Sequence, residues 1–217
     1  MTHQHPRILF LVRHGRSDAS SSDFVPYRNG PQWDPPLDAT GAEQARLLAR
    51  RLLVMDPPAA VYCSPMRRAR ETVAPYVAAT GAEVRYEGDL VEAHVGAWEG
   101  RSFEEIIAGD EQMLHLFRNQ DAMWLHGPGA EEPHAFRDRV VRAVDRIVEA
   151  TPEGNVLIVC HGLVINAYLS PLLGLEQHMF FLPDNTSLNT VVIDGHARSL
   201  RFLNDVRHLT EPDLFVR

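Results

Sequence analysis

Short apolar segments recur along the chain and have the pattern of buried β-strands. Runs of this length, rich in β-branched and aromatic residues, are typical of strands that are covered on both faces. Two further segments flank an Asp-Gly pair, which favours a hairpin turn near the end of the chain. The predicted strands are residues 7–12 (RILFLV), 59–63 (AAVYC), 155–160 (NVLIVC), 190–193 and 199–203.

Between these strands, apolar residues recur at the spacing of amphipathic helices. The first helix is predicted to open at Thr40, because Thr-Gly-Ala-Glu fits a capping box formed by Thr40 and Glu43. A second helix should follow Ser64-Pro65, with Ser64 as its N-cap, and run to about Thr80, where Gly81 can close it.

Two segments interrupt this alternation. Residues 17–36 are polar and contain several prolines, which predicts a long surface loop. Residues 100–135 include a predicted helix from Ser102 to Leu116 and would form a small helical cap over the edge of the sheet. A helix with an apolar stripe from Phe136 to Val148 follows and should end near Thr151.

The alternation of strands and helices predicts an α/β fold, a three-layer α/β/α sandwich with a mostly parallel central sheet and a small helical cap insertion. No repeat or linker divides the sequence, so residues 1–217 are expected to form one domain. A chain of 217 residues with 45% hydrophobic content can bury a sizeable core.

Charge and cysteine content narrow the class of protein further. The net charge of −8 is unfavourable for nonspecific binding to nucleic acid, although a local arginine cluster can still hold a phosphate ester. Cys63 and Cys160 lie in apolar segments, which indicates buried, reduced thiols. Residues 1–7 show no signal-like core and no apolar stretch approaches the length of a membrane span. We therefore expect a soluble cytoplasmic protein that binds no membrane.

Two of the predicted strands end in the same way, in LVRHG at residues 11–15 and in IVCHG at residues 158–162. Ligands of open α/β sheets bind beyond the carboxyl ends of the strands, so His14 and His161 should lie together at that edge. Arg13 adds a cation, and the glycines after the histidines allow the backbone to approach a ligand closely.

Two imidazoles, several guanidinium groups and a helix N-terminus together suit a phosphoryl group. The helix after Ser64 would aim its first amides and Arg67-Arg68 at the same edge. A neutral imidazole can attack phosphorus to form a phosphohistidine, while the cations neutralise the phosphoryl oxygens. The leaving alkoxide needs a proton, for which Glu92 is the candidate acid and Glu99 its competitor.

Four motifs, in this order, resemble those of the histidine phosphatase superfamily, the phosphoglycerate mutase-like group. They are Arg13-His14-Gly15, SPMRRARET at residues 64–72, LVEAHVGAWEG at residues 90–100 and His161-Gly162. The segments DPPLDATGAEQA at residues 34–45 and PGAEEPHAFRDRV at residues 128–140 also look like parts of that family. The resemblance thus extends over most of the chain.

This resemblance implies an enzyme that uses no metal and no cofactor and whose His14 becomes phosphorylated. Carried over by position, it implies that Arg13, Arg68 and His161 hold the phosphoryl group and that Glu92 acts as general acid and then as general base. Arg68 rather than Arg67 is the matching arginine, because it directly precedes Ala69. The backbone glycines Gly15 and Gly162 would border the phosphoryl group, Gly162 by offering its amide.

The chain departs from the family pattern directly after Arg-His-Gly. Many members carry Gln or Glu and then Thr or Ser, where this chain has Arg16-Ser17. Arg16 either adds positive charge near the mouth of the site or is a solvated surface residue. Many members carry Asn at the position of Ser20, whose shorter side chain would lose the phosphate contact or make it through water.

The predicted function is hydrolysis of a small phosphorylated metabolite by a phosphoric monoester hydrolase of the histidine acid phosphatase type. A mutase that uses the same phosphohistidine is the first alternative. Mutases of the family resemble Glu-Arg-His-Tyr-Gly at the acidic loop, where this chain reads Glu92-Ala93-His94-Val95-Gly96. A non-catalytic module that binds phosphorylated ligands is the second alternative.

The sequence does not identify the substrate. Aromatic and basic residues of the two interrupting segments could contact an organic leaving group or pack together, and Trp98 is expected to pack the catalytic loop. The sequence is compatible with a homodimer formed through a sheet edge but does not show one. The residues of the interrupting segments are Tyr27, Arg28, Trp33, Phe103 and Trp124.

Overall fold

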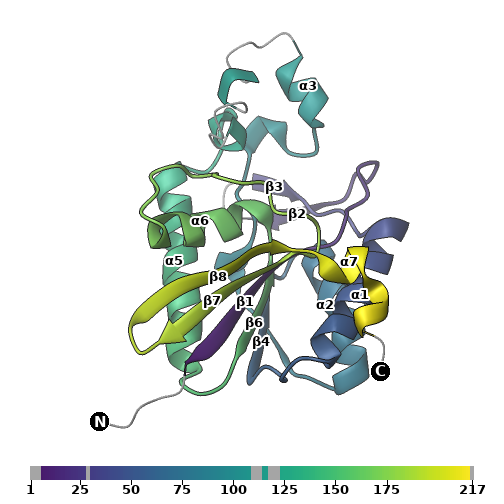
Figure 1. Ribbon diagram of the computed structural model, residues 1–217. Helices are drawn as coiled ribbons and strands as arrows, with labels where there is room; N and C mark the ends of the chain where they lie inside the picture. Colours follow the sequence, from purple (N-terminus) through teal and green to yellow (C-terminus); the bar gives the residue numbers. More distant parts are fainter. Residues whose placement is uncertain (1–5, 28–29, 109–113, 117–122, 216–217) are drawn as a thin grey trace.

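The computed structural model describes residues 6–27, 30–108, 114–116 and 123–215, and its centre is a six-stranded sheet with the order β5–β4–β6–β1–β7–β8 (Figure 1). Strands β5, β4, β6 and β1 pair in parallel, whereas β7 is antiparallel to its neighbours β1 and β8. The mostly parallel α/β fold predicted from the sequence is confirmed, as is the hairpin around Asp194-Gly195. The strands are β1 Arg7–Arg13, β4 Ala60–Cys63, β5 Val84–Tyr86, β6 Val156–Cys160, β7 Leu188–Asp194 and β8 Ala197–Asp205.

Helices cover both faces of this sheet (Figure 1). Leu9 and Leu11 of β1 face the core formed with α5 and α6, whereas Phe10 and Val12 face the core formed with α1 and α2. Successive side chains of a strand point to opposite faces, so burial on both sides explains why these strands are uninterrupted apolar runs. The helices are α1 Ala39–Leu53, α2 Arg67–Thr80, α5 Pro133–Ala150 and α6 Gly162–Leu172.

The predicted ends of two helices are confirmed, but the predicted start of α1 is wrong. Helix α2 is closed by Gly81 at φ +69°, and α5 ends with Thr151 as its C-cap. The N-cap of α1 is Asp38, whose carboxylate accepts from the amide of Gly41 at 2.7 Å. No capping box forms at Thr40, because its hydroxyl accepts from the guanidinium of Arg16 at 2.8 Å.

The predicted start of α2 is also wrong. The helix begins at Arg67, and its N-cap Met66 makes no capping bond through its side chain. The hydroxyl of Ser64, expected to cap the helix, lies 2.8 Å from Nε2 of His161. The hydroxyl that the local pattern assigned to the start of the helix is thus bonded to His161, at the end of β6. Local sequence cannot reveal this partner.

The segment predicted to be a long loop contains a separate two-stranded hairpin, formed by β2 Phe24–Tyr27 and β3 Gly30–Trp33. The loop prediction is wrong there because these strands are short, contain prolines and do not alternate in burial; Phe24 and Val25 are both exposed. The hairpin is joined to the rest of the molecule at Trp33, whose amide donates to the carboxylate of Glu99 at 2.8 Å.

Helix α3 (Phe103–Ile107) lies beyond the carboxyl ends of the parallel strands, at the top of Figure 1. It begins with a capping box between Ser102 and Glu105 and has Ala108 as its C-cap, and residues 114–116, at the predicted end of this helix, are helical as well. Residues 109–113 of that prediction lie outside the described residues. The remaining turns are η1 Gly88–Leu90, η2 Gly96–Trp98, η3 Met123–His126, α7 Arg207–Thr210 and η4 Pro212–Phe215. None of the described helices is long and apolar enough to cross a membrane.

The turn after β1 is held against the first turn of α1 by a close contact between backbones. A Cβ atom added at Gly41 would lie 2.0 Å from the carbonyl oxygen of Arg16, and one added at Gly15 would lie 2.7 Å from the carbonyl oxygen of Gly41. Side chains are therefore excluded on both sides of this contact. Because His14 directly precedes this turn, the contact fixes where His14 leaves the strand.

We expect Gly41→Ala to lower the free energy of unfolding by about 1–3 kcal/mol, the usual cost of overpacking. This sign is opposite to that of an ordinary Gly→Ala change in a helix, which stabilises. Gly88→Ala is the matched control, since a Cβ there meets nothing within 4 Å. Urea unfolding of both variants measures the difference, and equal stability of the two would contradict the close-contact account.

Candidate active site

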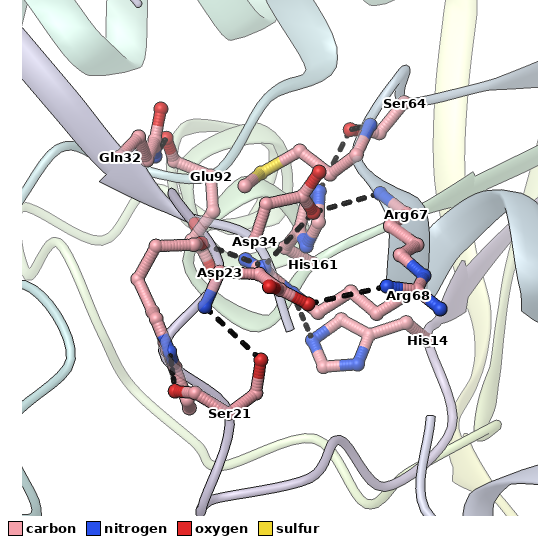
Figure 2. A network of polar contacts seen from close by, with 12 residues as sticks. His14, Ser21, Asp23, Gln32, Asp34, Ser64, Arg67, Arg68, Glu92 and His161 are labelled. Atoms are coloured by element: carbon pink, nitrogen blue, oxygen red, sulfur yellow. Dashed lines mark hydrogen bonds and ion pairs between the residues drawn. The ribbon is translucent and has the colours of Figure 1, made fainter. Parts of the chain in front are cut away.

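The carboxyl ends of β1 and β6 meet at a cavity of about 260 Å³. Its wall is built by residues from several segments: the end of β1, strand β3, residues 92–101, η3, and α6 with the loop that follows it. Figure 2 shows polar side chains at the inner end of this cavity, with His14, Arg68 and His161 close together and Glu92 beside them. The expectation that two strand ends bring His14 and His161 to one edge of the sheet agrees with this arrangement.

His14 presents a neutral imidazole whose Nε2 lone pair faces Arg68 and accepts a hydrogen bond from its Nε at 3.3 Å. Its Nδ1 lies 2.7 Å from the carbonyl oxygen of Gly15, and only a protonated Nδ1 can donate to that acceptor. The proton is thereby placed on Nδ1, and Nε2 carries the lone pair. Burial, followed by the charges of Arg68 and Arg13, holds the pKa of His14 well below its usual range. The ring is therefore neutral at neutral pH, with Nε2 unprotonated, as a nucleophile requires.

Arg68 and Arg13 supply positive charge beside this ring. Nε of Arg68 lies 3.3 Å from Nε2 of His14, and its Nη1 donates to the carbonyl of Trp33 at 3.2 Å. Arg13 donates to the carbonyl of Pro183, but its buried Nε has no hydrogen-bond partner. Burial lowers the pKa of both guanidinium groups, which shows how little solvent compensates their charge. Asp34, whose carboxylate lies 3.8 Å from Nη1 of Arg68, and Glu92 compensate part of this charge, and an anion in the cavity would compensate more of it.

His161 is fully buried directly behind His14, with the two ring centroids 5.1 Å apart. Its Nε2 is bonded to the hydroxyl of Ser64, while its Nδ1 is buried without a partner. Burial and the neighbouring charges of Arg68 and His14 lower the pKa of His161 well below its usual range. An unsatisfied ring nitrogen at this depth is a candidate contact for a phosphoryl oxygen.

Glu92 is the carboxyl group that faces these cations. One of its oxygens accepts from its neighbour's amide, that of Ala93, at 3.0 Å, and the other accepts from the amide of Leu163 at 3.1 Å. Burial raises the pKa of Glu92 despite these two amides and the charges of Arg68 and Arg13, which act in the opposite direction. A carboxyl group whose pKa is raised in this way suits a general acid.

Glu99, the competitor for this role, is committed to holding the backbone. Its two carboxylate oxygens accept from the amides of Trp33, at 2.8 Å, and Val95, at 2.9 Å. It therefore ties the hairpin β2–β3 to the acidic loop. Both carboxyl groups bind two backbone amides, and Glu92 is supported as the proton donor by its place beside Arg13 and Arg68 and by the pKa that burial raises.

Sequence reasoning missed the residue that positions Glu92. Arg139 of α5 is buried, forms an ion pair with Glu131 at 2.7 Å, and donates to the carbonyls of Asp89 and Val91 at 2.7 and 2.8 Å. It thus holds the backbone that leads into Glu92. The sequence contained a signal for this role, because Arg139 is a charged residue within the apolar face of a predicted helix.

A second missed cluster holds the backbone of His14. The amide of Asn185 donates to the carbonyl of His14 at 3.0 Å, and the backbone amide of Thr186 lies 3.0 Å from the carbonyl of Arg13. Thr186 has a φ of +58°, which is unfavourable for a β-branched residue. Its hydroxyl is bonded to Nε2 of buried His208 at 3.0 Å, and Nδ1 of His208 faces Arg51. Only the folded chain brings these residues behind His14.

The remaining candidates divide into those at the cavity and those away from it. Gly162 lines the cavity, whereas the amide of Gly15 is already bonded to the hydroxyl of Thr72 at 2.9 Å. Ser20 is exposed, does not line the cavity and donates to Asp18 at 2.6 Å. Arg16 is also exposed and pairs with Asp38, which supports its interpretation as a surface residue.

The aromatic residues of the interrupting segments also divide in this way. Trp33 and Trp124 line the cavity, and so does Trp98, expected only to pack the loop. Tyr27 lies elsewhere and donates to the carbonyl of Gly88 at 2.8 Å. Residue 28 and the side chain of Phe103 lie outside what the structure describes.

Comparison with known proteins identifies similar chains. A bifunctional protein of Mycobacterium tuberculosis is 31% identical over 208 residues, which cover 94% of this chain but 55% of that protein. This chain therefore spans about half the length of that relative. A metal-independent phosphoserine phosphatase of Arabidopsis thaliana is 29% identical over 212 residues. The match covers 96% of this chain and 86% of that protein.

Solved structures share the fold. A phosphoglycerate mutase from Bacillus anthracis superposes with a TM-score of 0.80 at 21% identity, covering 98% of this chain and 99% of that chain. At that identity the likeness concerns the fold alone. The family model described as histidine phosphatase superfamily (branch 1) matches residues 9–206, which include every polar residue of the inner cavity described above. The chain belongs to branch 1 of the histidine phosphatase superfamily.

Proposed function

We propose that this protein is a metal-independent phosphomonoester hydrolase, of the histidine acid phosphatase type, that acts through a phosphohistidine on His14. The observation that carries the proposal is the state of the His14 ring: its Nδ1 is bound by the carbonyl of Gly15, and its Nε2 lies beside Arg68. The names of relatives support the hydrolytic reaction, since the Arabidopsis thaliana relative is a metal-independent phosphoserine phosphatase.

In the first step, Arg13, Arg68 and His161 bind the phosphoryl oxygens of the ester. Nε2 of His14 attacks phosphorus, the new P–N bond forms and the P–O bond to the alcohol breaks. Glu92 donates its proton to the departing alkoxide, so that the alcohol leaves neutral. The hydrogen bond from Nδ1 to Gly15 stabilises the positive charge that develops on the imidazole ring.

In the second step, the Glu92 carboxylate takes a proton from water, and the resulting hydroxide attacks phosphorus. The P–N bond breaks, inorganic phosphate leaves, and His14 regains its lone pair. Glu92 is again protonated and ready for the next substrate. Both steps use the same two residues, because the water occupies the place that the alcohol has left.

Mutase activity would need the same phosphohistidine but would transfer the phosphoryl group to a second alcohol instead of water. The solved mutase of similar fold is too distant in sequence to argue for that reaction, but a probable phosphoglycerate mutase of Serratia proteamaculans, 32% identical over 171 residues, supports mutase activity as the alternative. A binding module would hold phosphate without turnover. The experiment below separates these functions.

His14→Ala should reduce hydrolysis of p-nitrophenyl phosphate in excess EDTA by at least about 10³-fold, because the nucleophile is lost. The wild-type protein should stay active in EDTA. His196→Ala is the matched control, since this histidine is exposed in the β7–β8 hairpin. Release of p-nitrophenol by all three proteins at one rate would contradict the role of His14, and an inactive wild type would contradict hydrolysis.

The pH dependence of kcat should follow the raised pKa of Glu92. Donation requires the protonated acid, so kcat for an alkyl phosphate should fall as pH rises through that pKa. His14 sets no limit near neutrality, because its pKa is lowered and Nε2 stays unprotonated. Glu92→Gln should remove this alkaline limb and reduce kcat for alkyl esters by about 10²- to 10⁴-fold.

The leaving group provides the control for that prediction. p-Nitrophenolate departs without a proton, so Glu92→Gln should impair its release much less than that of an alkoxide. Burst kinetics measures this first step separately from hydrolysis of the intermediate. If Glu99→Gln, rather than Glu92→Gln, showed the selective loss with alkyl esters, the assignment of the acid would be wrong.

A further inference from the structure

All three tryptophans of the chain line the one cavity that contains His14. Trp33 comes from β3, Trp98 from η2 and Trp124 from η3, which are segments far apart in sequence. Each tryptophan is only partly buried, so part of each side chain stays accessible. Three independent segments thus give the outer cavity an aromatic wall.

The other residues of the outer wall are mainly apolar as well. Val95 lies in the same loop as Glu92, and Met179 and Leu182 lie in the loop after α6. Leu182 is 62% exposed, so it forms part of the mouth. An alcohol that extends outward from the phosphoryl group would therefore contact mainly carbon surface, with Ser17, Gln32 and Asn166 as the neutral polar residues of the same lining.

Charge in the outer cavity disfavours a second anionic group on the substrate. Apart from Arg13 and Arg68, the cation among the described lining residues is Arg101, which is exposed and donates to the carbonyl of Glu105 at 3.0 Å. Glu99 also lines this space, with its carboxylate oxygens bound to the amides of Trp33 and Val95. A substrate carboxylate would meet this negative charge and lose its hydration without gaining a buried partner.

We propose, on the basis of the phosphatase function proposed above, that the substrate is a phosphate monoester whose alcohol part carries a flat apolar ring and no second negative charge. The tryptophans pack against the ring, while Arg13 and Arg68 hold the phosphoryl group. A hydrophobic pocket typically discriminates by about 10- to 200-fold for each apolar group that it binds. Esters that carry a carboxylate at that position are poor substrates.

The test compares two esters of primary alcohols that leave with similar chemistry: phenethyl phosphate and the phosphate ester of 3-hydroxypropanoate. We expect kcat/KM to be at least about tenfold higher for phenethyl phosphate. Equal values, or a preference for the carboxylate, would overturn the proposed substrate class.

A charge placed at the mouth sharpens the comparison. Leu182→Arg should lower the preference for phenethyl phosphate by about tenfold or more, chiefly by raising kcat/KM for the carboxylate ester. Leu214→Arg is the matched control, because Leu214 is equally exposed, at 63%, and does not line the cavity. The same shift in both variants would assign the effect to overall charge and overturn the role of the mouth.

Binding measured without turnover separates this inference from the proposed function. Because the tryptophans all line the cavity, their fluorescence should report titration with phenethylphosphonate, which cannot be hydrolysed. We expect it to bind at least about tenfold more tightly than 2-carboxyethylphosphonate. If neither ester is hydrolysed but this preference holds, the phosphatase function is wrong and the ligand class stands. If both esters are hydrolysed and the two phosphonates bind equally, the ligand class is wrong and the phosphatase function stands.

Discussion

The site depends on burying positive charge next to two imidazoles. Arg13 and Arg68 lie in the inner cavity with His14 and His161, where little water can compensate their charge. Adding a proton to either imidazole would place another positive charge in this space, so both rings stay neutral. One constraint therefore has two effects, since it attracts a phosphate dianion and also keeps the attacking lone pair of His14 available.

The same burial acts on Glu92 in the opposite sense. It disfavours the carboxylate and raises the pKa, although two backbone amides and two arginines favour the charged form. Glu92 can thus be protonated in a site whose histidines stay uncharged. The contacts of Arg139 with the backbone before Glu92 show that the fold uses a further buried arginine, outside the cavity, to keep this carboxyl in place.

Phosphoryl transfer needs His14 at a fixed position, and backbone contacts from three elements provide this. Gly41 of α1 meets the turn after His14, Thr72 of α2 binds the amide of Gly15, and the loop before β7 binds the carbonyls of Arg13 and His14. The loop includes Thr186, whose unfavourable φ is maintained by His208. Burial and the neighbouring Arg51 lower the pKa of His208 to about 4, so this support stays neutral together with the rings that it positions.

Periodicity in the sequence was sufficient for most of the main strands and helices, though not for β5 or α6, because burial on both faces leaves continuous apolar runs such as residues 155–160. Repeated His-Gly pairs at two strand ends were sufficient for the pairing of His14 with His161, because parallel strands bring their carboxyl ends to one edge. Local sequence determined neither the partner of Ser64 nor the β2–β3 hairpin, since a buried histidine and a loop carboxylate supply those contacts. Tertiary structure alone decided three further features: the neutral state of His14, the raised pKa of Glu92 and the wall of three tryptophans. Each depends on burial and contacts that arise only when separate segments of the chain come together.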